Sequence, residues 1–353
     1  PAPYVFNLGE FAMKKSLIAL AVLAASGAAM AQSSVTLYGV VDLALGRVDY
    51  NPATVGLKAK GKIQMQGGGL VLVNNGVSRI GFRGIEDLGG GLKVGFNYEQ
   101  GISAENGATD SATYQRQANV WVEGGFGQFK MGRAFSPSYN GMEAWELLGA
   151  PAYSVVGNTY GFVGNSSPRN NSQFSYKTPV FGGFSGEIGF ITKADRGQYD
   201  GDQHHKIDAN LIYANGPLGV GLSFNKVAKA KANYALGAKY DFGMFTLAAS
   251  YNDARNVNTG TWYSVTPISS KEGRRSGFTI GGLVKFDNVS LALDVARDMK
   301  REVKVAGTTY KYKKYTNAVV EAKYALSKRT FLYADYLRLD STNNYGIGLR
   351  HNF

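Results

Sequence analysis

From Ser34 to the end of the chain, apolar and polar side chains alternate with a period of two. About sixteen such segments of about 10 residues follow one another, a length that suits a strand crossing a membrane. The last one is the clearest: Tyr345, Ile347, Leu349 and Phe353 share one face, and Gly346, Gly348, Arg350 and Asn352 share the other. This period predicts β-strands whose two faces meet different surroundings.

The connections between these segments alternate between short and long. The short ones have tight-turn composition, as in Leu88-Gly89-Gly90-Gly91 and Asn215-Gly216-Pro217, whereas the long ones include Arg47 to Asn75 and Phe135 to Pro168. Long connections generally follow odd-numbered strands, so all long loops emerge at one end. We therefore predict an all-β fold, a 16-stranded antiparallel transmembrane β-barrel, which closes its own edges and satisfies its peptide groups within lipid.

A soluble β-sandwich is the alternative that also predicts alternation. A sandwich buries the apolar face of each sheet in a dry core and tolerates charge only outside. Tyr and Phe stand at many segment ends, as the aromatic girdles of a membrane barrel require, and Lys206 and Asp208 alternate with the apolar side chains of one segment. These features favour a barrel with its apolar face toward lipid and its polar face toward a water-filled lumen.

The N-terminal region has the features of an export signal. Met13-Lys14-Lys15 precedes an apolar run from Leu17 to Ala25 and a small-residue site at Ala29-Met30-Ala31. The apolar run is too short for a transmembrane helix, which needs about 20 residues. We expect three parts: residues 1–12 as an upstream non-native segment, residues 13–31 as a signal peptide and residues 32–353 as the barrel domain.

Composition and charge narrow the function. The chain has no cysteine, so an exported protein of this size needs a framework other than disulfides, and the barrel supplies one. The net charge is +12, but Lys and Arg are spread along the chain beside acids, without a basic helix or an RNA-binding motif. We therefore expect no binding to nucleic acid.

Catalytic chemistry is poorly represented. The histidines are His204, His205 and His351. The adjacent pair would point to opposite faces of a strand, and His351 falls on the predicted lipid face. No serine motif of the hydrolase type accompanies them. The sequence thus predicts a protein that is not an enzyme, with no cofactor and no metal site.

Several stretches resemble the trimeric Gram-negative outer-membrane porins, in particular the anion-selective branch of betaproteobacteria. The stretches are Ser34 to Gly39, Ser78 to Leu92, Arg116-Gln117-Ala118, Gly132-Arg133 and Gly348 to Phe353. The resemblance implies a sixteen-stranded homotrimer in the outer membrane with one pore per subunit. It also implies that Phe353 belongs to a C-terminal signal for the outer-membrane assembly machinery.

The segment from Phe135 to Pro168 follows the fifth predicted strand, where the resemblance implies an inward-folded constriction loop. Arg79 and Arg169 lie on the polar face of their segments, whereas Arg116 shares a face with Val120 and Val122, so its direction stays open. Ordinary pairing of the arginines with Asp42 or Glu99 is the alternative. The residues expected at the constriction are Arg79, Arg83, Arg116 and Arg169 on a basic wall, facing Glu143 and Glu146 on the loop.

The expected function is passive diffusion of small hydrophilic solutes through the pore, with anions favoured. A guanidinium stays charged at any relevant pH and binds anions through paired hydrogen bonds, so such a wall concentrates anions. Lysines in the loops would contact outer-membrane lipid and lipopolysaccharide. The alternatives left open are a substrate-specific anion or organic-acid channel, which would saturate with its ligand, and a structural adhesin barrel, which would not conduct.

Overall fold

The computed structural model describes residues 33–49, 61–68, 72–164, 168–192, 205–228, 230–255, 273–305 and 307–353. The upstream segment, the expected signal peptide and His204 lie outside these residues. In the part that is described, no helix is both long enough and apolar enough to cross a membrane.

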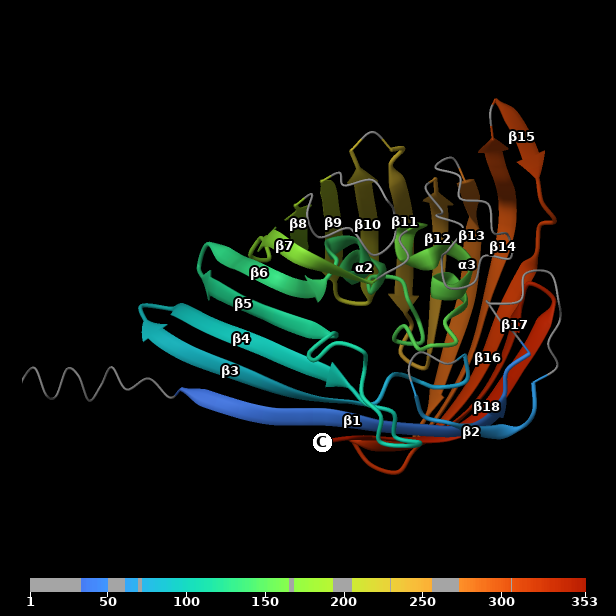
Figure 1. The fold of residues 1–353 in the computed structure, drawn as a ribbon, viewed down its shortest axis with the longest axis horizontal. Helices are drawn as coiled ribbons and strands as arrows, with labels where there is room; N and C mark the ends of the chain where they lie inside the picture. Colours follow the sequence, from blue (N-terminus) through green and yellow to red (C-terminus); the bar gives the residue numbers. More distant parts are fainter. Residues whose placement is uncertain are drawn as a thin grey trace, which may run out of the picture.

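Sixteen of the described strands form a closed antiparallel wall (Figure 1). In chain order they are β1 (Ser34–Arg47), β3 (Arg79–Gly89), β4 (Leu92–Gly101), β5 (Gln117–Gly124), β6 (Gly127–Phe135), β7 (Arg169–Lys177), β8 (Phe184–Ile191), β9 (Lys206–Asn215), β10 (Leu218–Val227), β11 (Asn233–Asp241), β12 (Phe245–Ala254), β13 (Gly273–Phe286), β14 (Val289–Val305), β16 (Thr316–Ala325), β17 (Thr330–Leu339) and β18 (Thr342–Asn352).

The wall closes where the first strand meets the last. Strand β1 pairs with β3 on one side and with β18 on the other, so Val40 lies opposite both Arg79 and Asn352. At the end of this seam, the Gly39 N–H donates to the Phe353 carbonyl at 3.0 Å, and the Phe353 N–H donates back at 3.1 Å. The predicted 16-stranded barrel is confirmed.

Two short strands lie outside the wall, in connections that the sequence predicted as long loops. Strand β2 (Gln64–Gln66) pairs with β1. Strand β15 (Thr308–Lys311) pairs with the end of β14, and this hairpin rises beyond the other strands (Figure 1). The connection expected at Lys300 to Tyr315 is therefore mostly an extended hairpin.

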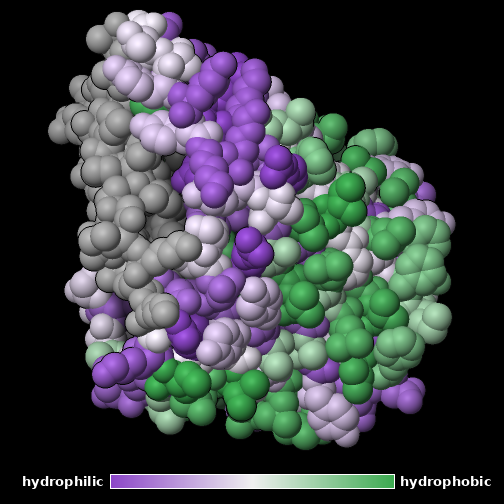
Figure 2. Space-filling view, turned by 90° about the vertical axis from the view of Figure 1, so that its right-hand side faces the viewer, coloured by the Kyte–Doolittle hydropathy of each residue, from purple (hydrophilic) through white to green (hydrophobic). Residues whose placement is uncertain are grey.

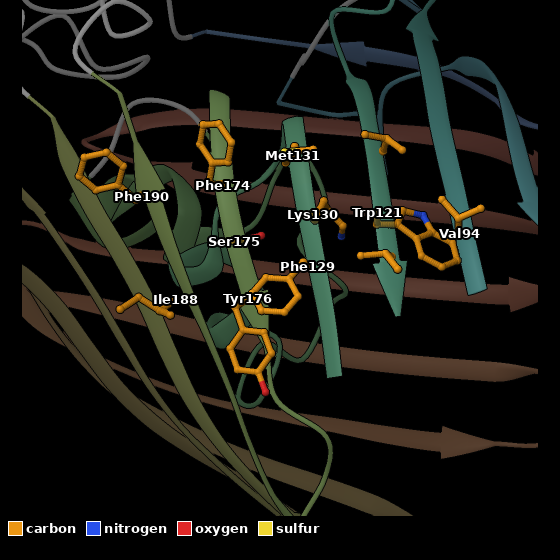
Figure 3. Close-up of a pocket in the computed structure, with 12 residues that line it drawn as sticks. Val94, Trp121, Phe129, Lys130, Met131, Phe174, Ser175, Tyr176, Ile188 and Phe190 are labelled. Atoms are coloured by element: carbon orange, nitrogen blue, oxygen red, sulfur yellow. The ribbon is translucent and has the colours of Figure 1, made fainter. Parts of the chain in front are cut away.

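The outer face of the wall is apolar and exposed. Ile280 is 61% exposed and Leu247 is 50% exposed, values that only a lipid-facing surface explains. Apolar side chains gather over a broad area of the outer surface (Figure 2), and Figure 3 shows aromatic and aliphatic side chains over β4 to β8. The inner face is polar, and it buries the carboxylates of Asp42, Asp294 and Glu321.

The connection between β6 and β7 folds into the barrel, as predicted for a constriction loop (Figure 1). It carries helix α2 (Pro137–Met142), which starts at Pro137 behind the capping hydroxyl of Ser136, and helix α3 (Val155–Gly164). Between them, Trp145 packs against Gly237, where an added Cβ would lie 2.4 Å from the indole. Glycine on the inner wall is what allows the loop to approach so closely.

Hydrogen bonds fix both helices to the wall. In α2, the Ser138 N–H donates to Asp208 at 2.6 Å, and the Ser138 carbonyl accepts from Ser223 at 2.8 Å. In α3, Thr159 accepts from Asn317 at 2.9 Å, and the Tyr160 hydroxyl donates to the Arg297 carbonyl at 2.9 Å. The two helices of the loop therefore rest against β8 to β14, β16 and β17.

Closure at the seam generates a test. A Cβ at Gly39 would lie 2.6 Å from the Arg79 carbonyl and 2.2 Å from the Phe353 ring, so Gly39→Val should force the seam apart. We expect a loss of about 1–3 kcal/mol in unfolding free energy, measured by urea unfolding in detergent. Gly282→Val is the matched control, because the nearest atom to a Cβ there is 3.4 Å away. Equal stability of the two variants would contradict the tight seam.

Candidate functional site

Glu99 on β4 draws together two of the predicted arginines. The Arg116 Nε lies 2.7 Å from Glu99 Oε1, and the Arg79 Nε lies 3.5 Å from Glu99 Oε2. The Tyr38 hydroxyl donates to the same carboxylate at 3.1 Å, and the Glu99 residue is only 4% exposed. The pairing with Glu99 that the sequence left as an alternative is therefore present. It holds both guanidinium groups beside the same carboxylate on the inner wall.

Arg116 lies in the lumen, a direction that the alternation left open. Strand β5 begins only at Gln117, so Arg116 belongs to the preceding connection and does not follow the phase of Val120 and Val122. Its backbone N–H donates to the Glu99 carbonyl at 3.1 Å, and its side-chain Nε donates to the Glu99 carboxylate at 2.7 Å. A phase argument fails at a residue just outside a strand.

Arg169 begins β7 and is placed by its packing. Its guanidinium lies 4.0 Å from the centre of the Phe135 ring, a cation–π contact, and it interacts electrostatically with Arg116 and Glu99. The alternation does not run unbroken along β7, because Ser172 has φ of 40° and the register with β6 shifts. The polar phase assigned to Arg169 from residues beyond Ser172 was therefore not a valid guide.

Arg83 lies four residues beyond Arg79 on β3, nearer to the short turn that joins β3 to β4. Its Nε donates to Asn97 at 3.1 Å, and its guanidinium lies 5.2 Å from the Tyr38 ring centre. Arg83 thus faces the lumen, as its phase predicted, but it is bound to Asn97 and has no ion pair with Glu99.

One further arginine, Arg350 on β18, was absent from the predicted site. Its guanidinium donates to Asn75 at 2.8 Å and interacts electrostatically with Asp42 and Arg116. The alternation placed Arg350 on the polar face, but its neighbours Gly346 and Gly348 gave no sign of a charged site. Arg79, Arg169 and Arg350 each interact with Arg116, and we call these four residues the arginine cluster.

The arginine cluster carries more positive than negative charge. Within the described residues, its four guanidinium groups are accompanied by the carboxylates of Glu99 and Asp42. Among the described residues, the guanidinium groups on this wall therefore outnumber the carboxylates that face them. Because Arg is not deprotonated in proteins, the surplus persists at any relevant pH.

The two loop acids differ from each other and from expectation. Glu146 is buried and accepts hydrogen bonds from the Leu148 N–H at 2.7 Å, the Ala150 N–H at 3.0 Å and the Ser154 hydroxyl at 2.8 Å. It therefore stabilises a turn of its own loop. Glu143 is exposed, and its electrostatic partners are Lys177, Lys239 and Glu187 on β7, β11 and β8.

The described residues contain no group of three or more His, Cys, Asp or Glu side chains that could hold a metal ion. What the geometry offers is a polar passage with a fixed basic wall on one side and a loop on the other. Such an arrangement sorts solutes by size and charge.

Comparison with known proteins agrees with this geometry. The model of the Gram-negative porin family matches residues 17–344. The chain is 34% identical to outer membrane porin protein 32 of Delftia acidovorans, over 96% of this chain and 93% of the relative. The chain belongs to the Gram-negative porin family. Major outer membrane protein P.IB of Neisseria meningitidis serogroup B is 29% identical to this porin, over 97% of this chain and all of the relative.

Solved structures show the same fold. The anion-selective porin from Comamonas acidovorans superposes on this porin with a TM-score of 0.69 at 24% identity, over 91% of this chain and all of the solved chain. This porin therefore spans the outer membrane of a Gram-negative bacterium and forms a channel for passive diffusion. It is a channel and not an enzyme, and neither a substrate-specific channel nor an adhesin is favoured.

Glu99 should limit the positive charge of the lumen. In Glu99→Gln, the side chain still accepts hydrogen bonds but one negative charge is lost beside Arg79 and Arg116. A unit charge about 4 Å from an ion in water is worth ~1 kcal/mol, with opposite sign for an anion and a cation, so the anion-to-cation permeability ratio should rise about thirtyfold. Reversal potentials in a salt gradient measure the ratio. Glu86→Gln, at an exposed residue of β3, is the control, and a fall in the ratio for Glu99→Gln would contradict this role.

Glu143 should make selectivity depend on pH. Desolvation by the surrounding walls raises the pKa of the Glu143 carboxyl above its ordinary value, while Lys177 and Lys239 oppose the rise. As pH falls from 7, Glu143 therefore takes up its proton earlier than an ordinary glutamate, the loop loses a negative charge, and anion preference increases. The permeability ratio of Glu143→Gln should change less between pH 7 and 5. Identical pH profiles for the two proteins would exclude Glu143 as the source.

Proposed function

We propose that this porin favours small anions and that the arginine cluster is its filter. The observation that carries the proposal is the gathering of four guanidinium groups beside the constriction loop, with Glu99 and Asp42 as the carboxylates that face them among the described residues. An anion passing this wall meets donors that match carboxylate and phosphate oxygens. A cation is repelled by the same guanidinium groups.

Passage also requires release. Glu99 occupies donors of Arg79 and Arg116, so an anion competes with a resident carboxylate for the same groups. Arg169 is engaged with the Phe135 ring on one face. Binding is therefore divided over several partly occupied cations, which suits a channel that selects by charge and does not retain its solute.

Planar-bilayer recording tests the filter. The wild-type porin should show a reversal potential of the anionic sign in a salt gradient. Arg79→Ser and Arg169→Ser should each lower the anion-to-cation permeability ratio, and the double variant should lower it further, with stepwise conductance retained. Arg338→Ser, at an exposed residue of β17, is the matched control and should leave the ratio unchanged. Cation preference of the wild type, or an unchanged ratio in the double variant, would refute the filter.

We further propose the partners and processing of the chain. The porin family is trimeric, which supports a homotrimer of this chain. The hairpin of β14 and β15 carries exposed lysines that suit the phosphates of lipopolysaccharide: Lys300, Lys304 and Lys311. Phe353 is 44% exposed on the outer face, which suits recognition by the outer-membrane assembly machinery. Residues 13–31 would be removed as a signal peptide, and residues 1–12 would be an upstream non-native segment.

A further inference from the structure

A second segment folds into the lumen besides the constriction loop. Residues 72–78, between β2 and β3, form what we call the inner segment, and Leu72, Val73, Asn74 and Asn75 are each less than 10% exposed. Val73 packs onto Gly46 of β1 and Gly346 of β18, where an added Cβ would lie about 3 Å from its side chain. The inner segment is therefore seated in the wall next to the seam.

The inner segment is joined to the constriction loop. The Ala152 N–H of the loop donates to the Asn74 carbonyl at 3.2 Å, and the Asn75 side-chain amide donates to the Tyr153 hydroxyl at 2.7 Å. Tyr153 is fully buried and donates in turn to Glu321 on β16 at 2.6 Å. The middle of the constriction loop is thus held between the inner segment and the wall.

Asn75 uses its remaining groups on the opposite side. Its backbone N–H donates to the Tyr333 hydroxyl at 3.1 Å, and Tyr333 donates to Asp42 at 2.5 Å. Its side-chain oxygen accepts from the Arg350 guanidinium at 2.8 Å. One residue therefore contacts the constriction loop, the barrel wall and the arginine cluster.

The hydrogen-bonding chemistry explains why an asparagine is needed. Each tyrosine hydroxyl gives its proton to a carboxylate, so it can only accept from Asn75. Arg350 has donors alone, so it requires an acceptor. Aspartate would have no donor for Tyr153, and leucine would have neither a donor nor an acceptor. The orientation of the Asn75 amide is fixed by its partners.

We propose that Asn75 is the positioning residue of the pore: it holds Arg350 at the arginine cluster and, through Tyr153, holds the constriction loop against the wall. Anion preference and the position of the constriction loop then depend on a residue that need not touch the solute. This inference rests on the proposed anion filter, because the role of Arg350 is part of that filter.

Bilayer recording of Asn75→Ala separates the two effects. Release of Arg350 should lower the anion-to-cation permeability ratio about fivefold, the change expected when a unit charge retreats from ~4 to ~8 Å from the path of both ions in water. Release of Tyr153 should lower the voltage at which channels close. Asn74→Ala is the matched control, since the Asn74 side chain is equally buried but contacts Gln66 and Asp42 and neither Tyr153 nor Arg350.

Double-mutant cycles show whether Asn75 acts through these partners. In an Arg350→Gln background, Asn75→Ala should change the permeability ratio no further, and in a Tyr153→Phe background it should change the closing voltage no further. Additive effects in both cycles, or wild-type behaviour of Asn75→Ala, would overturn the proposal. A cation-selective wild type would refute the anion filter, whereas the closing-voltage cycle would still test Asn75.

If Asn75→Ala does not insert, Tyr153→Phe alone provides the test. It keeps the ring and removes only the hydroxyl that links Asn75 to Glu321. The closing voltage should fall while the permeability ratio stays at the wild-type value. An unchanged closing voltage would contradict the link between the inner segment and the constriction loop.

Discussion

A chain that crosses lipid as strands has to satisfy every peptide group from within, because the hydrocarbon offers no water. Here the requirement is met by closure, with β1 paired to both β3 and β18. Closure creates an inside, and the strict alternation of side chains then sends every second residue there. The polar lumen, the buried carboxylates on its wall and the space for an inward loop all follow from that one constraint.

The same constraint explains what the sequence could predict. Alternation and connection length are local properties, so strands, turns and the connection that became the constriction loop could be read directly. The site was harder to predict because it depends on departures from alternation. Arg116 lies one residue outside β5, and Arg169 is separated from the regular part of β7 by the irregular backbone at Ser172. In both cases the neighbours that fix the side chain are remote in sequence.

Remote contacts also account for what was missed or misplaced. Arg350 meets Asn75 across 275 positions, and no local pattern connects an asparagine in a long connection with an arginine near the chain end. Glu146 lies on the constriction loop, as predicted, but the loop turns back on itself and the Glu146 carboxylate accepts hydrogen bonds from backbone N–H groups of the loop. Only the resemblance to porins, and not the spacing of residues, pointed to the wall that holds Arg79.

The constriction loop rests on β8 to β14, β16 and β17, whereas the arginine cluster comes from the other side of the ring. The barrel therefore has a supporting half and a working half. In the supporting half, the glycines and amides beneath the loop are constrained by their contacts with it, so substitutions there act on a solute by moving the loop. In the working half, an exchange of one or two cations alters the charge that a passing solute meets. Such a division allows related channels to differ in the solutes that they pass while they keep one architecture.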